Sequence, residues 1–305
     1  MTGIVLAVVA LAMFSANIVL TRFATARLAT STGFLITLLV NIAFSALLFG
    51  GELLLRPEPL AWDGRGVLLF ALAGLFTTYL GRFFVLEVIA RLGPAKASAF
   101  QVSSPLFTFV IALLFLGERL TPLAIFGMVL TMLGLLLVAL SGARTTAAPV
   151  SKEPRGRREH WMRSGLAIGV VSSAAYGVGN VMRGAGVRAW DEPIAGALIG
   201  ALVGLALHFV FGSGHAEVVR SLRTAHRGGL ALFGLSGVLT ITAQMVLISA
   251  MRYAPVSVVA LITLCTPLLV FPMSYFMLKN EEGINPRTLV GAVLSLAGIA
   301  MIILH

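Results

Sequence analysis

The stretch VSSPLFTFVIALLFLGERLTPLAIFGMVLTMLGLLLVAL, residues 102–140, holds two apolar runs separated by the short polar turn Gly117-Glu118-Arg119. Each run approaches the length of about 20 residues that an α-helix needs to cross the hydrocarbon core of a bilayer. Backbone polar groups in lipid must be paired within their own segment, which favours helices over open strands. This stretch therefore predicts two membrane-spanning helices joined by a tight turn.

Apolar runs of this kind follow one another along the whole chain. Of the 305 residues, 58% are hydrophobic and 11% are charged, and the mean hydropathy is +0.99. A soluble domain carries about 25% charged residues to cover its surface, so lipid is the expected solvent. We predict an all-α integral membrane protein with ten transmembrane helices and no soluble domain. The predicted spans are residues 3–21, 32–55, 66–90, 95–117, 121–141, 163–182, 194–212, 229–250, 256–279 and 286–304.

The formal net charge is +10, and most Arg and Lys residues stand in the connections between the apolar runs. Anionic lipid headgroups are therefore the expected partners of the basic loops. Nucleic-acid binding is not expected, because the basic residues form no patch on a foldable soluble unit. Cys265 is the single cysteine, which excludes intramolecular disulfides and thiolate metal clusters. We expect no metal and no cofactor.

A polar linker separates two halves that resemble each other. Seven residues of the first half recur in the same order, 161 to 164 positions later. We predict a first five-helix repeat over residues 1–142, a basic linker over residues 143–162 and a second five-helix repeat over residues 163–305. Because five is odd, the second repeat must enter the membrane from the opposite side, and inverted repeats of this kind are a recurring plan of secondary transporters. The matching pairs are Arg91 and Arg252, Pro94 and Pro255, Pro105 and Pro267, Glu118 and Glu282, Pro122 and Pro286, Gly127 and Gly291, and Gly134 and Gly298.

Several short motifs make the chain resemble the EamA branch of the drug/metabolite transporter superfamily. They are Arg91-Leu92-Gly93-Pro94-Ala95, Ser104-Pro105-Leu106-Phe107 and Leu116-Gly117-Glu118-Arg119-Leu120-Thr121, followed by Gly127 and Gly134. The second half keeps the proline step as Thr266-Pro267-Leu268, and Asn17 matches the family pattern in the first span. The resemblance covers nearly the whole chain. It implies ten helices, a central cavity and export of small metabolites or drugs, and it does not name the cargo.

Arg82 is a charged residue inside the third predicted span, eight residues before its end, or about 12 Å along a helix axis. A charge at that depth costs on the order of 3 kcal/mol unless it finds water or a partner. The functional interpretation is a cavity-facing guanidinium that pairs with a carboxylate or another anionic group of the substrate. The alternatives are snorkelling to the headgroups and a structural bond to helix-end carbonyls. Tyr79, three residues earlier, is predicted to lie on the same face.

Polar residues recur at helical spacing in the sixth predicted span. Ser173, Tyr176, Asn180 and Arg183 form one stripe through an apolar segment. Asn17 holds the place in the first span that corresponds to Asn180. These side chains are predicted to face the cavity, and hydrogen bonding between helices is the alternative.

Pro105 and Pro267 stand inside the fourth and ninth predicted spans. Each proline removes one backbone hydrogen bond and frees the carbonyl four residues earlier, at Gln101 and Thr263. Neighbouring hydroxyls, including those of Ser103, Ser104 and Thr266, can satisfy that backbone. The prolines are hinge candidates, and static bends are the alternative. Together with Gln244, which the repeat places level with Arg82, the predicted substrate-binding residues are Asn17, Tyr79, Arg82, Gln101, Ser104, Tyr176, Asn180, Gln244, Thr263 and Thr266.

Glu87 and His208 are titratable residues near helix ends. Glu87 is a candidate site for proton coupling, and an ion pair with Arg91 four residues on is the alternative. His208 near the end of the seventh span has the same two interpretations. Counter-substrate exchange is a second way of driving transport.

These features predict a secondary active transporter that exports a small polar metabolite, such as an amino acid or an organic acid, or a drug, by alternating access. A channel or a lipid scramblase of the same fold is the alternative. An intramembrane enzyme is disfavoured, because the chain has no His-Glu-x-x-His metal site, no phosphate-binding loop and no Gly-x-Ser-x-Gly elbow. The expected location is a bacterial-type cytoplasmic (inner) membrane.

The orientation in the membrane is left open by two conflicting arguments. The family resemblance favours a cytoplasmic N-terminus, which leaves six Lys and Arg residues in inside loops and fifteen in outside loops. The positive-inside rule favours the reverse orientation.

Overall fold

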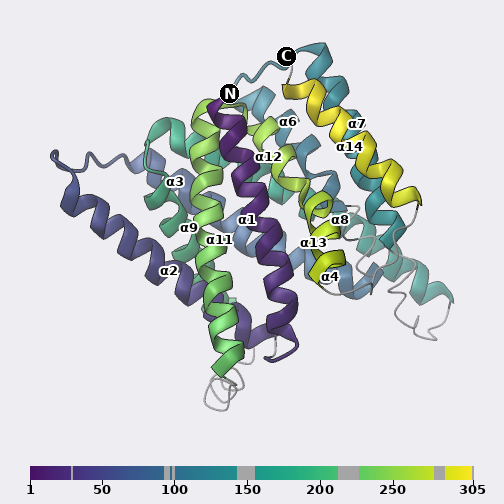
Figure 1. Ribbon diagram of the computed structural model, residues 1–305, viewed down its shortest axis with the longest axis horizontal. Coiled ribbons are helices and arrows are strands. Elements are labelled where there is room, and N and C mark those ends of the chain that lie inside the picture. The colour runs from purple at the N-terminus through teal and green to yellow at the C-terminus, as the bar shows by residue number, and fades with distance from the viewer. Residues whose placement is uncertain are drawn as a thin grey trace. The chain divides into compact units, whose positions relative to one another are not determined.

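The computed structural model describes residues 1–28, 30–92, 97, 100–142, 155–211, 227–277 and 286–303. Within these ranges the regular structure is helical throughout, and no strand is present (Figure 1). This agrees with the predicted all-α class. The elements are α1 (Thr2–Thr25), α2 (Thr30–Leu55), α3 (Gly64–Ala73), the π-helix η1 (Gly74–Gly81), α4 (Arg82–Leu92), α6 (Ser104–Phe115), α7 (Pro122–Gly142), α8 (Arg155–Ala189), α9 (Pro193–Phe211), α11 (Arg227–Tyr253), α12 (Val256–Leu264), α13 (Thr266–Met277) and α14 (Pro286–Ile303).

Eight of the described helical segments are long and apolar enough to cross a membrane. Two shorter apolar helices, Phe100–Phe115 and Val256–Val270, lie where the fourth and ninth spans are predicted. The count of ten spans therefore stays a prediction. The helix of the sixth predicted span continues beyond residue 182 and ends at Ala189.

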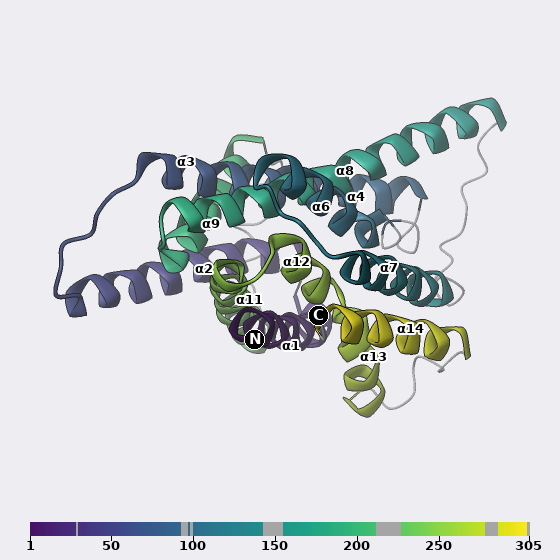
Figure 2. The ribbon, with the colours of Figure 1, turned by 90° about the horizontal axis from the view of Figure 1, so that it is seen from above.

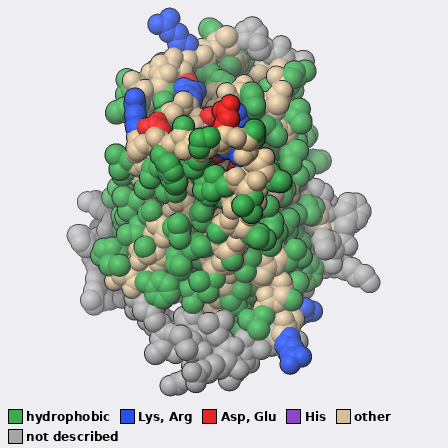
Figure 3. Space-filling model, turned by 90° about the vertical axis from the view of Figure 1, so that its left-hand side faces the viewer, with side chains coloured by type: hydrophobic (Ala, Val, Ile, Leu, Met, Phe, Trp, Pro, Cys, Tyr) green, Lys and Arg blue, Asp and Glu red, His purple; other side chains and the backbone are tan. Residues whose placement is uncertain are grey.

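Large apolar side chains cover the outside of the helices. Leu47, Leu114 and Phe115 are each more than 70% exposed. In Figure 3 hydrophobic side chains cover most of the visible face, and the described Lys, Arg, Asp and Glu side chains lie towards its two ends. A surface of this kind suits lipid, because contiguous apolar patches of more than a few hundred Å² are rare on soluble monomers.

The chain divides into two compact units that do not coincide with the two sequence repeats. Unit 1 comprises Met1–Tyr79 and Met182–Ala254, and unit 2 comprises Leu80–Val181 and Pro255–His305. Each unit thus takes helices from both halves of the sequence. The chain passes between the units at three places, inside η1, inside α8 and between Ala254 and Pro255.

In unit 1, α1 packs along α11, and α2 packs on α11 and α9 (Figures 1 and 2). Glycines allow the close approach of α9 to α3 and η1. A Cβ on Gly196 would lie 2.5 Å from the ring of Phe70, and a Cβ on Gly74 would lie 2.8 Å from the Cα of Gly200. These glycines therefore form a close-packing face of α9.

In unit 2, α7 and α14 pack side by side (Figure 2). Their contacts are made by glycines that stand at equivalent positions of the two repeats. A Cβ on Gly127 would lie 2.6 Å from the carbonyl oxygen of Gly298, and a Cβ on Gly291 would lie 2.6 Å from that of Gly134. Between these contacts, the hydroxyls of Thr131 and Ser295 each bond to backbone carbonyls of their own helix. The two repeats thus contribute equivalent faces to one interface.

The helix α12 forms the core of unit 2. Every residue from Val256 to Ile262 is buried, so the helix is covered on all sides. It packs against α6. A helix that is apolar all round is typical of a buried position.

Candidate functional site

Arg82 is the first residue of α4 and directly follows the π-helix η1. It lies seven residues before Ile89, the end of the third span, or about 10 Å along the helix axis. Its side chain is exposed, and the phenol of Tyr176 on α8 lies close enough to interact with it electrostatically. The structure therefore brings together two of the predicted site residues in unit 2.

The packing of α8 on α4 explains why Tyr176 lies near Arg82. The hydroxyl of Ser172 donates a hydrogen bond of 3.1 Å to the carbonyl of Gly81, the residue before Arg82. Tyr176 follows Ser172 by one helical turn, so it lies on the same face of α8. Short-range helical periodicity and one hydrogen bond between helices thus place the phenol.

The same helix α8 also packs on residues 100–108. The hydroxyl of Ser173 donates to the carbonyl of Phe100 over 2.5 Å, and a Cβ on Gly177 would lie 2.6 Å from the Cβ of Phe107. The amide of Asn180 donates to the hydroxyl of Thr108 over 3.4 Å, a long and therefore weak bond. The polar stripe of α8 makes hydrogen bonds between helices here, which is the alternative that the sequence left open.

The two predicted proline bends have the same geometry. Near Pro105, the amide of Ser103 donates to the carbonyl of Phe100 over 3.0 Å and the amide of Leu106 donates to Ser103 over 3.1 Å. Near Pro267, Cys265 and Leu268 make the equivalent bonds over 3.0 and 2.9 Å. Each helix is interrupted by one tight turn two residues before its proline, at Ser103 and at Cys265.

The polar side chains near these two turns differ in their hydrogen bonds and in their burial. The hydroxyl of Ser103 donates to Phe100, so the satisfied carbonyl is that of Phe100 and not that of Gln101. The hydroxyl of Thr263 donates back to Val259 and Ala260 of its own helix. Ser104 is buried, and Gln101 and Thr266 are half-buried.

Three predicted site residues belong to unit 1. The side-chain oxygen of Asn17 accepts a 2.7 Å hydrogen bond from Ser236, which ties α1 to α11. The ring of Tyr79 packs on Phe211 with centroids 5.7 Å apart. Gln244 is half-buried on α11.

The prediction that Tyr79 and Arg82 lie on one face rests on a helix type that the structure does not have at these residues. It assumed an α-helix, in which residues three apart are neighbours. Residues Gly74–Gly81 form a π-helix, in which hydrogen bonds span five residues instead of four. The α-helical spacing rule therefore does not apply between Tyr79 and Arg82, and their shared face stays a prediction.

Glu87 is half-buried on α4, and the side chain of its predicted partner Arg91 lies outside the described part of the structure. His208 makes an edge-to-face contact with Phe34, with centroids 5.4 Å apart. Both residues stay candidates for coupling.

Two contacts between helices were not predicted from the sequence. Arg183 lies inside the sixth span and donates a 2.7 Å hydrogen bond to Thr77 of η1. Glu118, in the turn before the fifth predicted span, accepts hydrogen bonds at the start of α12 in the other repeat. A charged residue in line with the stripe of α8 was a signal for the first contact, but no local pattern signals the second.

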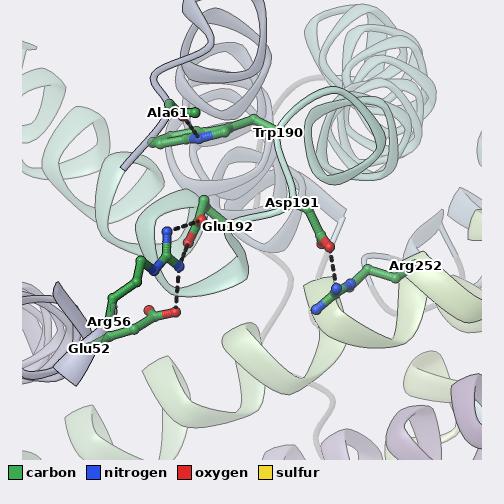
Figure 4. Close-up of polar contacts among 7 residues, drawn as sticks. All are labelled: Glu52, Arg56, Ala61, Trp190, Asp191, Glu192 and Arg252. Carbon is green, nitrogen blue, oxygen red and sulfur yellow. Dashed lines mark hydrogen bonds and ion pairs between the residues drawn. The ribbon is translucent and has the colours of Figure 1, made fainter. Parts of the chain in front are cut away.

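A network of charged residues lies at one end of unit 1 (Figure 4). The guanidinium of Arg56 donates to both carboxylate oxygens of Glu192, over 2.6 and 2.8 Å, and to Glu52 over 2.8 Å. These hydrogen bonds hold the pKa of Arg56 above its ordinary value, and the bond with Glu192 contributes most to that rise. Next to Glu192, Asp191 pairs with Arg252, and the indole of Trp190 donates to the carbonyl of Ala61 over 2.9 Å. Three consecutive residues thus fasten the turn between α8 and α9 to three other segments.

The apolar exterior, the spanning helices and the intramembrane arginines define a multi-pass integral membrane protein. The model of the EamA-like transporter family matches residues 1–140 and 163–304, which is nearly the whole chain in two parts. The chain belongs to this family, and the family suggests a membrane transporter of the drug/metabolite type.

A solved structure supports the fold. The chain is similar to a protein described only as "Crystal structure of protein", with a TM-score of 0.69 and 17% sequence identity over 99% of this chain and 97% of the other. At this identity the likeness concerns the fold alone. A search of the curated proteins finds no match.

Proposed function

We propose that this protein is a secondary active transporter that exports a small polar metabolite or drug by alternating access. The observation that carries the proposal is Arg82, a guanidinium inside a membrane span whose side chain is exposed beside Tyr176. Ionisable residues within spans are costly and mark substrate or ion pathways by default. Membership of the EamA-like transporter family supports the same conclusion.

The chemistry of Arg82 and of the polar side chains of unit 2 favours an anionic substrate. The planar guanidinium presents paired N–H groups that match a carboxylate. The neutral polar groups of unit 2, namely Tyr176, Asn180 and Gln101, can donate and accept hydrogen bonds for the rest of the molecule. We therefore expect an amino acid or an organic acid as cargo. Ser104 and Thr266 stay in the proposed substrate-binding set of unit 2, and Thr263 is its weakest member because its hydroxyl is bonded within its helix.

The proposal extends to topology, coupling and location. We propose two inverted five-helix repeats, residues 1–142 and 163–305, joined by a basic linker over residues 143–162 that contacts anionic headgroups. Glu87 is the proposed site of proton coupling, with counter-substrate exchange as the second mode. The proposed location is a bacterial-type inner membrane with both termini in the cytoplasm. A C-terminal reporter that is active only in the cytoplasm tests the orientation, and a silent reporter would reverse it.

A ligand screen followed by a flux assay tests the function. Ligands that bind the folded state raise its melting temperature by mass action. We expect amino acids or organic acids to raise it, with nucleobases and cationic drugs as the comparison panel. In liposomes, the compound found should show saturable uptake that is accelerated by the same compound on the opposite side. Flux that does not saturate and shows no such acceleration would indicate a channel instead.

A further inference from the structure

The chain passes between the two units at three places, and only one of them lies outside a helix. The passages at Tyr79–Leu80 and Val181–Met182 fall inside η1 and α8. The third passage, Ala254–Pro255, separates the end of α11 at Tyr253 from the start of α12 at Val256. No continuous helical hydrogen-bond ladder runs across this passage, because Pro255 has no N–H to donate. The ring of Pro255 fixes its φ, so rotation at the passage is confined to the ψ angles of Ala254 and Pro255.

On the side of unit 1, the residues before this passage are held in place. Arg252 pairs with Asp191 on the turn between α8 and α9 (Figure 4). The amide of Ala254 donates to the carbonyl of Ala250 over 3.1 Å. Gly3 of α1 has room for no side chain, because a Cβ there would lie 2.6 Å from the Cβ of Ala254.

On the side of unit 2, the residues after the passage are held by Glu118. The first N–H groups of a helix need an acceptor, which a side chain at the N-cap usually supplies. Pro255 holds that position in α12 and has no side-chain acceptor. Glu118 supplies it from the first repeat: one carboxylate oxygen accepts from the amide of Val256 over 2.7 Å, and the other accepts from the hydroxyl of Ser257 over 3.0 Å.

The position of Glu118 makes this contact more than a surface cap. Glu118 is 7% exposed, and Val256 and Ser257 are fully buried. The helix that it caps forms the core of unit 2 and leads to the turn at Cys265. A buried carboxylate that accepts backbone N–H bonds forms strong, short, charge-assisted hydrogen bonds.

We infer that Glu118 is a positioning residue for transport, which fixes the start of α12 so that the link Ala254–Pro255 acts as a short pivot with anchored ends. The inference rests on the proposed function, because a pivot serves a protein whose two units change their arrangement. Glu118 itself does not touch the substrate. It acts through α12.

The experiment measures backbone exchange and the spread of unit-to-unit distances in the full-length protein in lipid nanodiscs. The variants are Glu118→Ala and Glu118→Gln, with Glu58→Ala as the matched control, since Glu58 is an exposed glutamate in the loop after α2. Hydrogen–deuterium exchange follows the amides of Val256 and Ser257. Spin labels at the exposed positions Leu54 and Phe126 report the distance between the two units. Labels at the exposed positions Leu54 and Leu235 report a distance within unit 1.

We expect Glu118→Ala to speed exchange at Val256 and Ser257 about fivefold, the scale of a lost helix cap. The distance distribution between units should broaden while that within unit 1 stays unchanged. Glu118→Gln keeps one acceptor oxygen and should give a smaller effect in the same direction, and it provides the test if the alanine variant does not fold. The control variant should change neither measurement.

Two results would overturn the inference. One is unchanged exchange at Val256 and Ser257. The other is faster exchange with an unchanged distribution between units, which would make Glu118 a stabilising cap and nothing more. Neither measurement uses a substrate, so a protein that transports no compound would refute the proposed function by a separate result.

Discussion

The guanidinium of Arg183 donates a hydrogen bond to the hydroxyl of Thr77 over 2.7 Å, and Thr77 donates in turn to the carbonyl of Ala73. The contact joins α8 to the π-helix η1 within unit 1. Thr77 is buried, so its hydroxyl is costly to leave without partners. Arg183 is therefore an intramembrane cation with a structural partner in the protein.

Removing the hydroxyl of Thr77 should destabilise the protein. Thr77→Val keeps the shape of the side chain and leaves Arg183 without this acceptor, at a cost of about 1–3 kcal/mol. Thr77→Ser keeps the hydroxyl and is the matched control. Thermal unfolding of the purified protein should show a lower melting temperature for the valine variant alone. Equal melting temperatures for Thr77→Val and the parent protein would mean that the contact contributes nothing.

The glycine interface of α7 and α14 should not accept side chains. Gly127→Ala and Gly291→Ala each push a Cβ to 2.6 Å from a backbone carbonyl oxygen, which cannot move aside cheaply. We expect each variant to lose about 1–3 kcal/mol of stability, as for an overpacked core. Gly234→Ala in α11 is the control, because no atom lies within 4 Å of its Cβ position. A control variant as unstable as the other two would refute the packing argument.

The prolines beside the two interrupted helices are predicted to act as hinges. Pro105→Ala and Pro267→Ala should fold and melt close to the parent protein, because the turns at Ser103 and Cys265 are held by backbone hydrogen bonds that use no proline atom. Turnover of the compound found by the ligand screen should fall several-fold in counterflow. Unchanged turnover in both variants would reduce the prolines to static bends.

The pair between Arg56 and Glu192 should stabilise unit 1 at neutral and alkaline pH. Glu192→Ala removes both bonds of the forked contact and should lower the melting temperature, whereas Glu58→Ala should not. The pKa of Arg56 is raised in the folded state, so this contribution is present below the unfolded pKa and is lost only as pH rises through the folded pKa. The gap between parent and variant should thus be the same at pH 7 and at about pH 10, well below the ordinary arginine pKa. A gap that closes by about pH 10 would contradict this assignment.

The sequence predicted the helical membrane fold well because lipid imposes a simple rule on hydrophobicity and length. It also predicted the glycine pairs of α7 and α14, since Gly127 and Gly291 stand at equivalent repeat positions. The polar stripe of α8 could be predicted for a different reason, because Ser173, Tyr176 and Asn180 follow the period of an α-helix.

The failures arise where the local rule changes or the contact is distant in sequence. The relation of Tyr79 to Arg82 depended on an α-helical period that the π-helix η1 does not follow. The bond from Glu118 to Val256 joins residues 138 positions apart, and nothing near Glu118 marks its partner. That the predicted site residues of the two units bind one substrate together stays a prediction, which rests on the sequence repeat.

The central claim is that Arg82 binds an anionic group of the substrate, and substrate binding to Arg82 variants tests it most directly. The measurement is isothermal titration of the carboxylate compound found by the screen into the purified parent protein, Arg82→Lys and Arg82→Gln. We predict that Arg82→Lys, which keeps the charge and loses the planar fork, binds about tenfold more weakly. Arg82→Gln should lose binding while its melting temperature without ligand stays close to that of the parent. Parent-like affinity in Arg82→Gln would contradict the account.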